Sequence, residues 1–191
     1  MVSALDIPSV REATVPISVE QYHALTDSGK LTEAVELLWG VIVKKMAKSP
    51  LHTLIARRLY DQLSALLGAN CHCRMEQPLT LEDSEPEPDL AVVDGSPEDY
   101  LTAHPGTASF VAEIAISTVD LDRVKANAYA TAGIPEYWLV RPEDGLVECF
   151  SRPVGGAYRE TKTIDVKDQR ELLCSLGTAD LEALFHRIDW G

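Results

Sequence analysis

Several features that define common protein classes are missing from this chain of 191 residues. No apolar run approaches the ~18 residues that a membrane-spanning helix needs, so we expect no membrane segment. The N-terminus lacks a basic start followed by an apolar stretch, which predicts no signal peptide and a cytoplasmic location. Hydrophobic residues make up 46% and charged residues 25% of the chain, a balance typical of a globular protein and not of a coiled coil, a collagen-like chain or a disordered tail.

Cysteine is scarce, and the familiar catalytic motifs are absent. The four cysteines are Cys71, Cys73, Cys149 and Cys174. Cys71-His72-Cys73 has no second Cys or His pair at the spacing of a zinc site. A chain of this length without a signal peptide is not expected to be a disulfide scaffold, so we expect all four cysteines to be reduced. The chain has no Gly-x-x-x-x-Gly-Lys-Ser/Thr, Gly-x-Gly-x-x-Gly, His-Glu-x-x-His or Gly-x-Ser-x-Gly motif. These absences disfavour nucleotide-cofactor enzymes, zinc hydrolases and serine hydrolases.

Basic residues are missing from one long stretch. Between Met75 and Asp122 there is no lysine or arginine, and this stretch accounts for nearly all of the net charge of −13. One interpretation is a solvated acidic loop, which would include Glu82, Asp83, Glu85 and Glu87. The other is that some carboxylates converge on a hard cation such as Mg²⁺. An acidic protein is a poor candidate for wrapping nucleic acid by bulk charge, but it can perform metal-dependent phosphate chemistry.

Apolar periodicity and turn residues predict a mixed α/β order, in which a central sheet is flanked by helices. We expect an extended arm over residues 1–17 and a single domain over residues 18–191. Helices are predicted at 18–27, from Pro50 to Gly68, at 97–103, from a Ser117–Asp120 cap to Gly133, and at 178–186. Strands are predicted in a 34–46 hairpin that pivots at Trp39-Gly40, and at 71–76, 78–82, 88–94, 108–116, 135–141, 145–151 and 157–164.

Two acidic residues occur in strands that are otherwise apolar. Glu113 is the only charge in the segment FVAEIAI, and burying an unpaired carboxylate costs several kcal/mol. It therefore needs a metal, a cation or a proton, unless it faces solvent at an edge. Asp89 opens another strand after Pro88, although a lone Asp there is commonly a turn residue. Neighbouring strands lie ~5 Å apart, so in the right register Asp89 and Glu113 would both ligate one ion.

Three further residues have two interpretations each. Glu36 lies in the apolar segment VELL and is either a site residue or the exposed phase of an amphipathic hairpin. Lys125 follows Asp122 on an alanine-rich helix. It is either half of an exposed ion pair worth ~0.3–0.5 kcal/mol or a cation directed at the carboxylates. His52, at a helix start, is interpreted as a cap or a core-edge residue.

These segments together resemble the Uma-type restriction endonuclease family of the PD-(D/E)XK nuclease superfamily. The resemblance covers residues 18–165 and is carried by VELLWGVIVKKMAKSPLH, EPEPDLAVV, VAEIAIST, DLDRVKANAYATAGIPEYWLV and the hairpin that follows. It implies a restriction-endonuclease-like fold, a mixed sheet with helices on both sides. It also implies that acidic residues meet at a fork between strands.

The resemblance implies a role for each candidate residue. Asp89 matches the Asp of the Pro-Asp motif and Glu113 the second strand acid, and both are the implied metal ligands. Glu36 matches the early acid of the hairpin motif and supports the metal directly or through water. Position 115, which usually carries the superfamily lysine, is Ala115, and the resemblance places the relocated lysine at Lys125. The implied activity is a Mg²⁺-dependent (or Mn²⁺-dependent) endonuclease that hydrolyses DNA phosphodiester bonds.

DNA and a second copy of the chain are the implied partners, because nucleases of this superfamily are often dimers. Candidate phosphate contacts are Lys44, Lys45, Lys48, Arg57 and Arg58. An apolar contact or plain core is expected from Leu172, Leu173, Leu181, Leu184 and Phe185. The alternative function is a nuclease fold with weak or no catalysis that binds metal or a partner, and the net acidity favours it.

Overall fold

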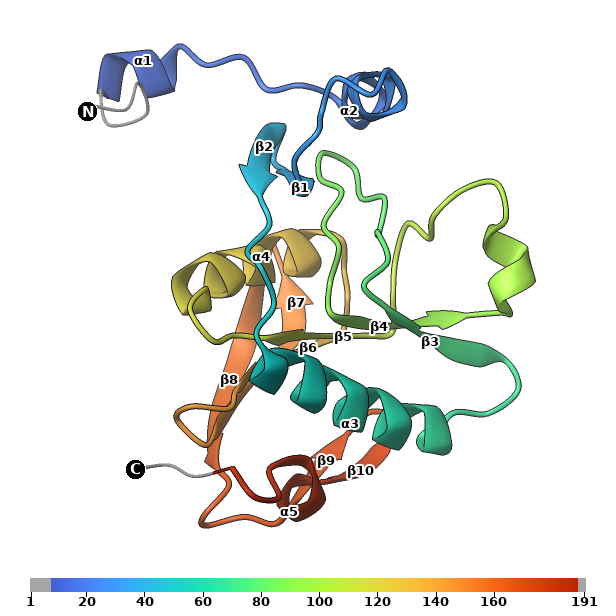
Figure 1. Ribbon diagram of the computed structural model, residues 1–191, viewed down its shortest axis with the longest axis vertical. Helices are drawn as coiled ribbons and strands as arrows, with labels where there is room; N and C mark the ends of the chain where they lie inside the picture. The colour runs from blue at the N-terminus through green and yellow to red at the C-terminus, as the bar shows by residue number, and fades with distance from the viewer. Residues whose placement is uncertain (1–7, 189–191) are drawn as a thin grey trace.

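A six-stranded mixed sheet is the centre of the computed structural model, which describes residues 8–188 (Figure 1). The strand order is β3-β4-β5-β6-β7-β8. Their bounds are Cys71–Met75, Leu90–Asp94, Phe110–Ile114, Glu136–Arg141, Leu146–Val154 and Ala157–Asp165. The β5–β6 pair is parallel and the other four pairs are antiparallel. A parallel pair needs a crossover connection, and helix α4 (Val119–Thr131) provides it.

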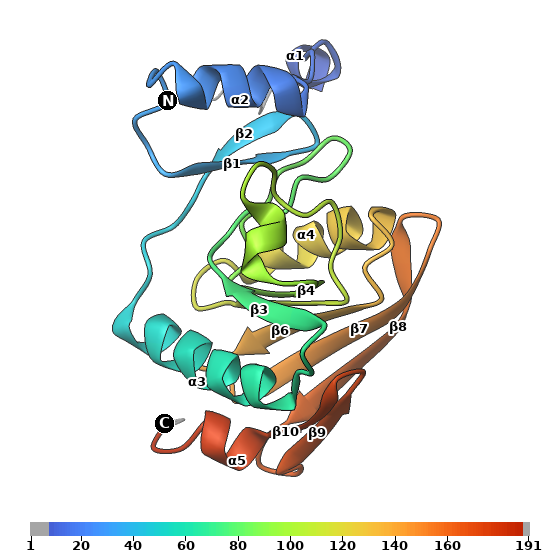
Figure 2. The same cartoon turned by 90° about the vertical axis from the view of Figure 1, so that its right-hand side faces the viewer.

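Helices cover both faces of this sheet, which confirms the predicted α/β class (Figure 2). On one face, Ile55 and Leu59 of α3 (Pro50–Leu66) belong to the same core as Phe110 and Trp138. On the other face, α4 packs its alanines and Tyr129 against the sheet. All five residues of β5 are buried, as an apolar strand covered on both faces requires.

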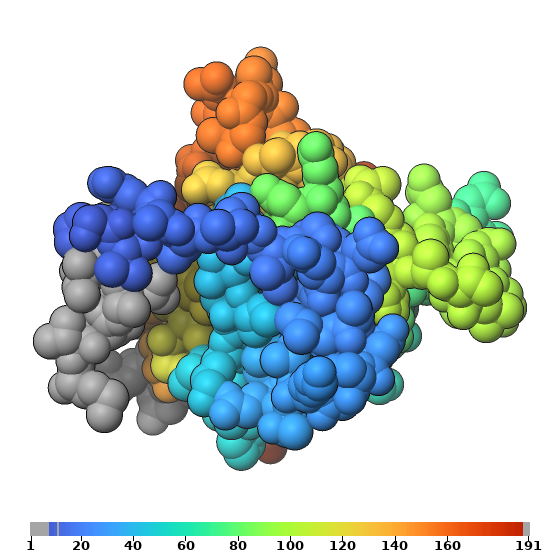
Figure 3. Space-filling view, turned by 90° about the horizontal axis from the view of Figure 1, so that it is seen from above, coloured from blue at the N-terminus to red at the C-terminus, as the bar shows by residue number. Residues whose placement is uncertain are grey.

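The N-terminal elements form a separate layer beyond α4, and they cover one end of the molecule (Figures 2 and 3). They are α1 (Pro8–Glu12), α2 (Val19–Asp27) and the hairpin β1–β2 (Val35–Leu38 and Val41–Lys44). The predicted capping box of α2 is present: Ser18 accepts from the Gln21 amide, and the Gln21 side chain accepts from the Ser18 amide. β1 also bridges to Glu85, so the acidic loop packs against the hairpin.

The turn of this hairpin requires glycine. Trp39 and Gly40 have φ angles of 48° and 72°, the left-handed pair that a two-residue hairpin turn uses. A side chain on Gly40 would place its Cβ 2.3 Å from Cβ of Pro16, because the chain before α2 crosses the turn here. The Ile17 amide donates to the Gly40 carbonyl at 3.0 Å. The predicted hairpin is therefore confirmed, and its turn also holds the N-terminal segment.

Two predictions for the first half of the chain are wrong. The extended arm contains a helix, α1, while residues 1–7 lie outside the described residues and the division at residue 17 stays a prediction. Residues 78–82 form a loop instead of a strand. The Leu79 amide donates to the Pro86 carbonyl and the Leu81 amide donates to the Ser84 carbonyl, both at 2.9 Å. Pro78, the one proline in this segment, cannot donate to a ladder, and the buried Leu79 and Leu81 pack from a loop.

The C-terminal helix predicted at 178–186 is mostly wrong. Residues there form the hairpin β9–β10 (Glu171–Cys174 and Gly177–Asp180), followed by the single turn α5 (Leu181–Leu184). Asp180 ends the strand and caps the helix, because its side chain accepts from the Ala183 amide. The predicted 97–103 helix is a short 3-10 turn, η2 (Pro97–Tyr100), and α4 begins after Thr118, with no side-chain cap.

The remaining sequence expectations concern thiols, the C-terminal apolar residues and the membrane. All four cysteines are free thiols. Four of the five apolar residues near the C-terminus lie in the core, and Leu173 is 76% exposed. Within residues 8–188, helices are too short or too polar to cross a membrane.

Candidate functional site

A pocket of about 140 Å³ opens where the sheet, α3, α4 and the hairpin meet. One wall is the start of α3 and another is the first half of α4. Between them lie the adjacent ends of β4 and β5, and residues 45–49, which we name the connector because they join β2 to α3, cross the pocket. Half of the lining residues are charged, and they include all four predicted site residues, Glu36, Asp89, Glu113 and Lys125.

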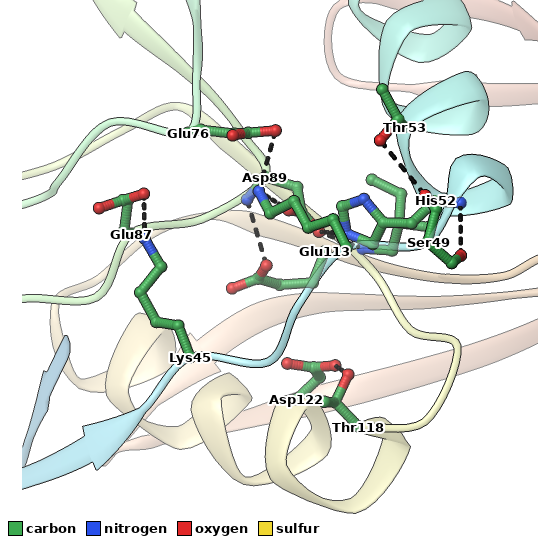
Figure 4. A network of polar contacts seen from close by, with 12 residues as sticks. Lys45, Ser49, His52, Thr53, Glu76, Glu87, Asp89, Glu113, Thr118 and Asp122 are labelled. Carbon is green, nitrogen blue, oxygen red and sulfur yellow. Dashed lines mark hydrogen bonds and ion pairs between the residues drawn. The ribbon is translucent and has the colours of Figure 1, made fainter. Parts of the chain in front are cut away.

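Asp89 and Glu113 lie side by side. In the antiparallel β4–β5 ladder Leu90 is opposite Ala112, so the residue before Leu90 lies next to the residue after Ala112. The Asp89 amide donates to Glu113 Oε2 at 3.1 Å, and the Ile114 amide donates to Asp89 Oδ2 at 2.8 Å. Both carboxylates are at most 5% exposed. Main-chain donors thus fix one oxygen of each carboxylate at the same edge of the sheet, as Figure 4 shows.

Two basic side chains, His52 and Lys48, complete the surroundings of Asp89. His52 Nε2, from the first turn of α3, donates to Asp89 Oδ2 at 2.9 Å, and Lys48 Nζ lies 3.0 Å from Oδ1. Burial alone would raise the pKa of Asp89, but the hydrogen bond and charge of His52, the charge of Lys48 and the Ile114 amide lower it to about 2. Asp89 is therefore an ionised carboxylate at neutral pH.

Lys125 is the centre of a buried charge cluster. Its ammonium lies 2.8 Å from Glu36 Oε1, 3.1 Å from Glu113 Oε1 and 3.8 Å from Asp122 Oδ1. Burial would lower the pKa of Lys125, but Glu113, Glu36 and Asp122 together raise it. Thr118 donates a short hydrogen bond, 2.5 Å, to the other oxygen of Asp122. Three chain segments that are distant in sequence thus meet at one ammonium group.

Glu113 has an environment opposite to that of Asp89. Burial is the largest cause that raises its pKa, and the charges of Asp89, Asp122 and Glu36 add to it; Lys125 opposes them, and the result is about 8. The Tyr129 hydroxyl donates to Glu113 Oε1 at 2.8 Å. Two adjacent carboxyl groups with pKa values pushed in opposite directions are typical of acid–base sites in enzymes.

The structure excludes the solvent-exposed alternatives for the predicted site residues. Glu36 is 2% exposed, so it is not the outward phase of the hairpin. Lys125 is 6% exposed and is not half of a surface ion pair. Asp89 belongs to the sheet edge and not to a free turn. Their catalytic and metal-binding roles stay predictions, whereas their convergence in space is a property of the fold.

Sequence reasoning missed the role of His52. It is not the cap of α3, since Ser49 accepts from the His52 amide, and its ring contacts Asp89 instead. Its Nδ1 atom is buried and has no hydrogen-bond partner among residues 8–188, so Asp89 is what orients the ring. The available signal was its place on the apolar stripe of α3, four residues before Ala56 and three before Ile55.

The predicted basic residues divide into two groups. Lys44, Lys45 and Lys48 line the pocket, and each also pairs with a carboxylate. Arg57 pairs with Asp61 on the exposed side of α3, and Arg58 donates to main-chain carbonyls near the C-terminus. The two arginines are therefore not placed for a phosphate at this pocket.

The solvated-loop interpretation holds for Glu82 and Asp83 but is wrong for Glu85. Glu85 is 6% exposed, because its segment bridges to β1. Its carboxylate accepts from the Thr80 hydroxyl and lies 2.7 Å from His23 Nε2. Glu87 is half-buried and pairs with Lys45 at the pocket.

The donor set at the pocket fits a hard divalent cation through Asp89 and Glu113. Both offer carboxylate oxygens, the ligand type that Mg²⁺ prefers. Among residues 8–188 there is no group of three His, Cys, Asp or Glu side chains arranged to enclose a metal. Mg²⁺ is commonly held by one or two carboxylates, with water and substrate phosphates as its other ligands, so two carboxylates in an open pocket suit it.

Comparisons with known proteins agree with this fold. Residues 19–184 match the Uma2 family, whose description is "Putative restriction endonuclease". A crystal structure from Anabaena variabilis, described as "a putative nuclease belonging to DUF820", has a similar fold with a TM-score of 0.69. The two chains are 19% identical, and the match covers 89% of this chain and 98% of the other. No curated protein matches this chain significantly.

Proposed function

We propose, because the chain belongs to the Uma2 family, that it is a metal-dependent nuclease that hydrolyses phosphodiester bonds of DNA at this pocket. The observation that carries the proposal is the convergence of Asp89, Glu113 and Lys125 from three separate elements in one buried cluster. Perturbed pKa values cluster at functional sites, and phosphate chemistry uses both carboxylates that hold a cation and an ammonium group that stabilises developing negative charge.

Asp89 and Glu113 would hold the cation, Mg²⁺ or Mn²⁺. When bound, it would polarise the phosphate and lower the pKa of an attacking water. His52 keeps Asp89 oriented and supports its negative charge. Burial and the neighbouring carboxylates raise the pKa of Glu113 to about 8, and a cation bound beside it would lower that pKa and favour the ionised form.

Lys125 supplies positive charge at a fixed place in the pocket lining. Glu36 holds this ammonium group from the hairpin side at 2.8 Å, so Glu36 is a positioning residue in this account. As water adds to phosphorus and the bond to the leaving oxygen breaks, negative charge develops on the phosphate oxygens. A preorganised ammonium stabilises that charge without reorganisation.

A DNA cleavage assay tests the proposal. We expect supercoiled plasmid and duplex oligonucleotides to be cut in the presence of Mg²⁺ or Mn²⁺ and not in EDTA. Asp89→Asn and Lys125→Met should reduce cutting by more than about 100-fold, because loss of an outer-shell partner alone costs about 10–100-fold. Glu82→Gln, at an exposed acid of the same acidic stretch, is the matched control. Undiminished metal-dependent cutting by both site variants would reject the assignment.

One observation favours a second candidate, a nuclease fold without efficient catalysis. The carboxylate oxygens of Asp89 and Glu113 all accept hydrogen bonds from the protein, so the charges compensate one another without a metal. Calorimetric titration with Mn²⁺ separates the candidates. Binding that Asp89→Asn abolishes, without cleavage of any DNA, would support the second one.

A further inference from the structure

The four carboxylate oxygens of Asp89 and Glu113 are not equally accessible. Glu113 Oε2 and Asp89 Oδ2 accept from main-chain amides, which cannot leave without breaking the sheet edge. Glu113 Oε1 accepts from Lys125 and Tyr129, and both donors are buried. Asp89 Oδ1 differs, because its only donor among the described residues is Lys48.

Lys48 is also the most easily displaced of these donors. It lies on the connector, where the neighbouring Met46 and Ala47 are exposed, and its side chain is 26% exposed against 7% for Lys125. Movement of its ammonium group therefore removes little buried surface. Lys125 is held by three carboxylates, whereas Lys48 has two partners, Asp89 and Glu76.

Glu76 offers Lys48 a partner at the rim of the pocket. Its carboxylate lies 2.9 Å from Lys48 Nζ, and its amide donates to the Asp89 carbonyl at 3.1 Å. The backbone of Glu76 has a φ of 54°, a left-handed conformation that costs a non-glycine residue about 1–2 kcal/mol and concentrates at functional sites. An ammonium group that leaves Asp89 would still be paired with Glu76.

We infer that Lys48 occupies the cation position at Asp89 Oδ1 in the metal-free protein and exchanges with the divalent cation, so that Lys48 sets the metal affinity of the site. This inference rests on the proposed metal site and adds a residue outside the candidate set of acids and Lys125. A divalent cation bound at Asp89 Oδ1 would lie close to the Lys48 ammonium group and repel it, so Lys48, the most exposed of these donors, moves away as the metal enters. The exchange needs no change in the sheet, because Oδ2 stays bound to the Ile114 amide.

Calorimetric titration of the full chain with Mn²⁺ at fixed pH and salt tests this exchange without measuring cleavage. Lys48→Met should bind Mn²⁺ about tenfold more tightly than the original protein, which corresponds to about 1.4 kcal/mol. Lys48→Arg keeps the charge and should stay within about threefold of the original. Lys45→Met is the matched control. It removes the same charge from the same connector, but from a lysine that pairs with Glu87, and its effect should also stay within about threefold.

Thermal melting of each variant shows that the comparison is between folded proteins, and Asp89 in Lys48→Met still has His52 and the Ile114 amide. If the original protein binds Mn²⁺ through Asp89 and Lys48→Met binds equally or less tightly, the exchange is wrong and the proposed metal site stands. Equal tightening by Lys45→Met and Lys48→Met would also overturn it, since general charge would then explain the effect. If neither the original nor Lys48→Met binds Mn²⁺, both the exchange and the metal site are wrong.

Discussion

At the scale of single residues, the pocket is a balance of buried charges. One ammonium group, Lys125, faces Glu36, Glu113 and Asp122, and the surplus of carboxyl groups raises the pKa values of Glu113 and Asp122 above their usual range, with burial as the largest cause. Burial and like charge thus oppose the ionisation of Glu113 and Asp122, and a bound divalent cation would favour it. Stability and metal affinity should depend on pH through these groups.

The protonation of Glu113 predicts how stability changes with pH. Its pKa in the folded protein, about 8, exceeds the usual value of 4.5. The stability it contributes is therefore fully present below about pH 4.5 and is lost as pH rises to about 8. Between about pH 6 and pH 9 the free energy of unfolding of the original protein should fall by ~3 kcal/mol relative to Glu113→Gln.

Urea unfolding without added metal at the two pH values measures this difference. Asp89 does not contribute in this window, because its pKa of about 2 lies below the usual value and its stabilisation is lost only in acid. Parallel pH profiles of the original protein and Glu113→Gln would show that Glu113 is ionised throughout.

His52 should control the metal affinity through Asp89. It donates to the Asp89 oxygen that also accepts from the Ile114 amide, so it fixes the orientation of the carboxylate. Residues that hydrogen-bond to a metal ligand typically contribute about 10–100-fold to the metal affinity. We therefore expect His52→Ala to weaken Mn²⁺ binding by about that factor. His72→Ala is the control, because His72 is also partly buried but its ring contacts the Gly95 carbonyl. A loss of equal size in both variants would point to a general loss of structure.

At the scale of elements, the hairpin β1–β2 positions Glu36, and the turn at Gly40 fixes the hairpin. Gly40→Ala should lower the free energy of unfolding by about 3 kcal/mol, because a left-handed residue costs ~1–2 kcal/mol and the clash with Pro16 adds to it. Gly29→Ala measures the cost of the left-handed backbone conformation without the clash. Gly29 has a similar φ of 68° but open space around its Cβ position, so about 1 kcal/mol is expected. Chemical denaturation of both variants checks the difference, and equal losses would exclude the steric term.

Sequence patterns predicted those elements whose signals are local. The capping box at Ser18, the apolar stripe of α3 and the buried strand around Glu113 all correspond to observed elements. The 78–82 strand and the C-terminal helix were predicted wrongly, because their leucines are buried by loop and hairpin contacts that neighbouring residues do not encode. Apolar alternation alone does not distinguish a strand from a loop that packs on a core.

The candidate site shows the same limit. Glu113 was recognisable as a charge in an apolar strand, and the partner it needed was predicted to be a cation or a metal. The register that sets Asp89 beside Glu113, and the fold that brings Glu36 to Lys125, are long-range properties. His52 was misjudged because a histidine at a helix start has several ordinary structural roles. Its contact with Asp89 joins residues 37 positions apart.

At the scale of the whole molecule, acidity is concentrated beside the pocket. The stretch from Met75 to Asp122 contains the acidic loop and also Asp89, Glu113 and Asp122 of the site. The positive charge at the pocket mouth comes from Lys44, Lys45 and Lys48, all of which are paired with carboxylates. DNA binding should therefore involve few phosphate contacts.

Few contacts predict a shallow dependence of DNA affinity on salt. With three lysines at the pocket mouth, the slope of log affinity against log salt should be about −3, because each neutralised phosphate contributes about −0.9. Fluorescence anisotropy with labelled duplex DNA measures it, with Ca²⁺ in place of Mg²⁺ to prevent cleavage. A slope beyond about −6 would mean that another cationic face of the molecule binds the DNA.

The most direct measurement is a crystal of the full chain soaked in Mn²⁺ and examined by anomalous scattering. We expect one peak in the pocket within bonding distance of carboxylate oxygens of both Asp89 and Glu113, with Lys48 no longer in contact with Asp89. A Mn²⁺ peak bound elsewhere, or a pocket that stays closed by its own ion pairs at saturating Mn²⁺, would contradict the claim that these residues form a metal-dependent nuclease centre.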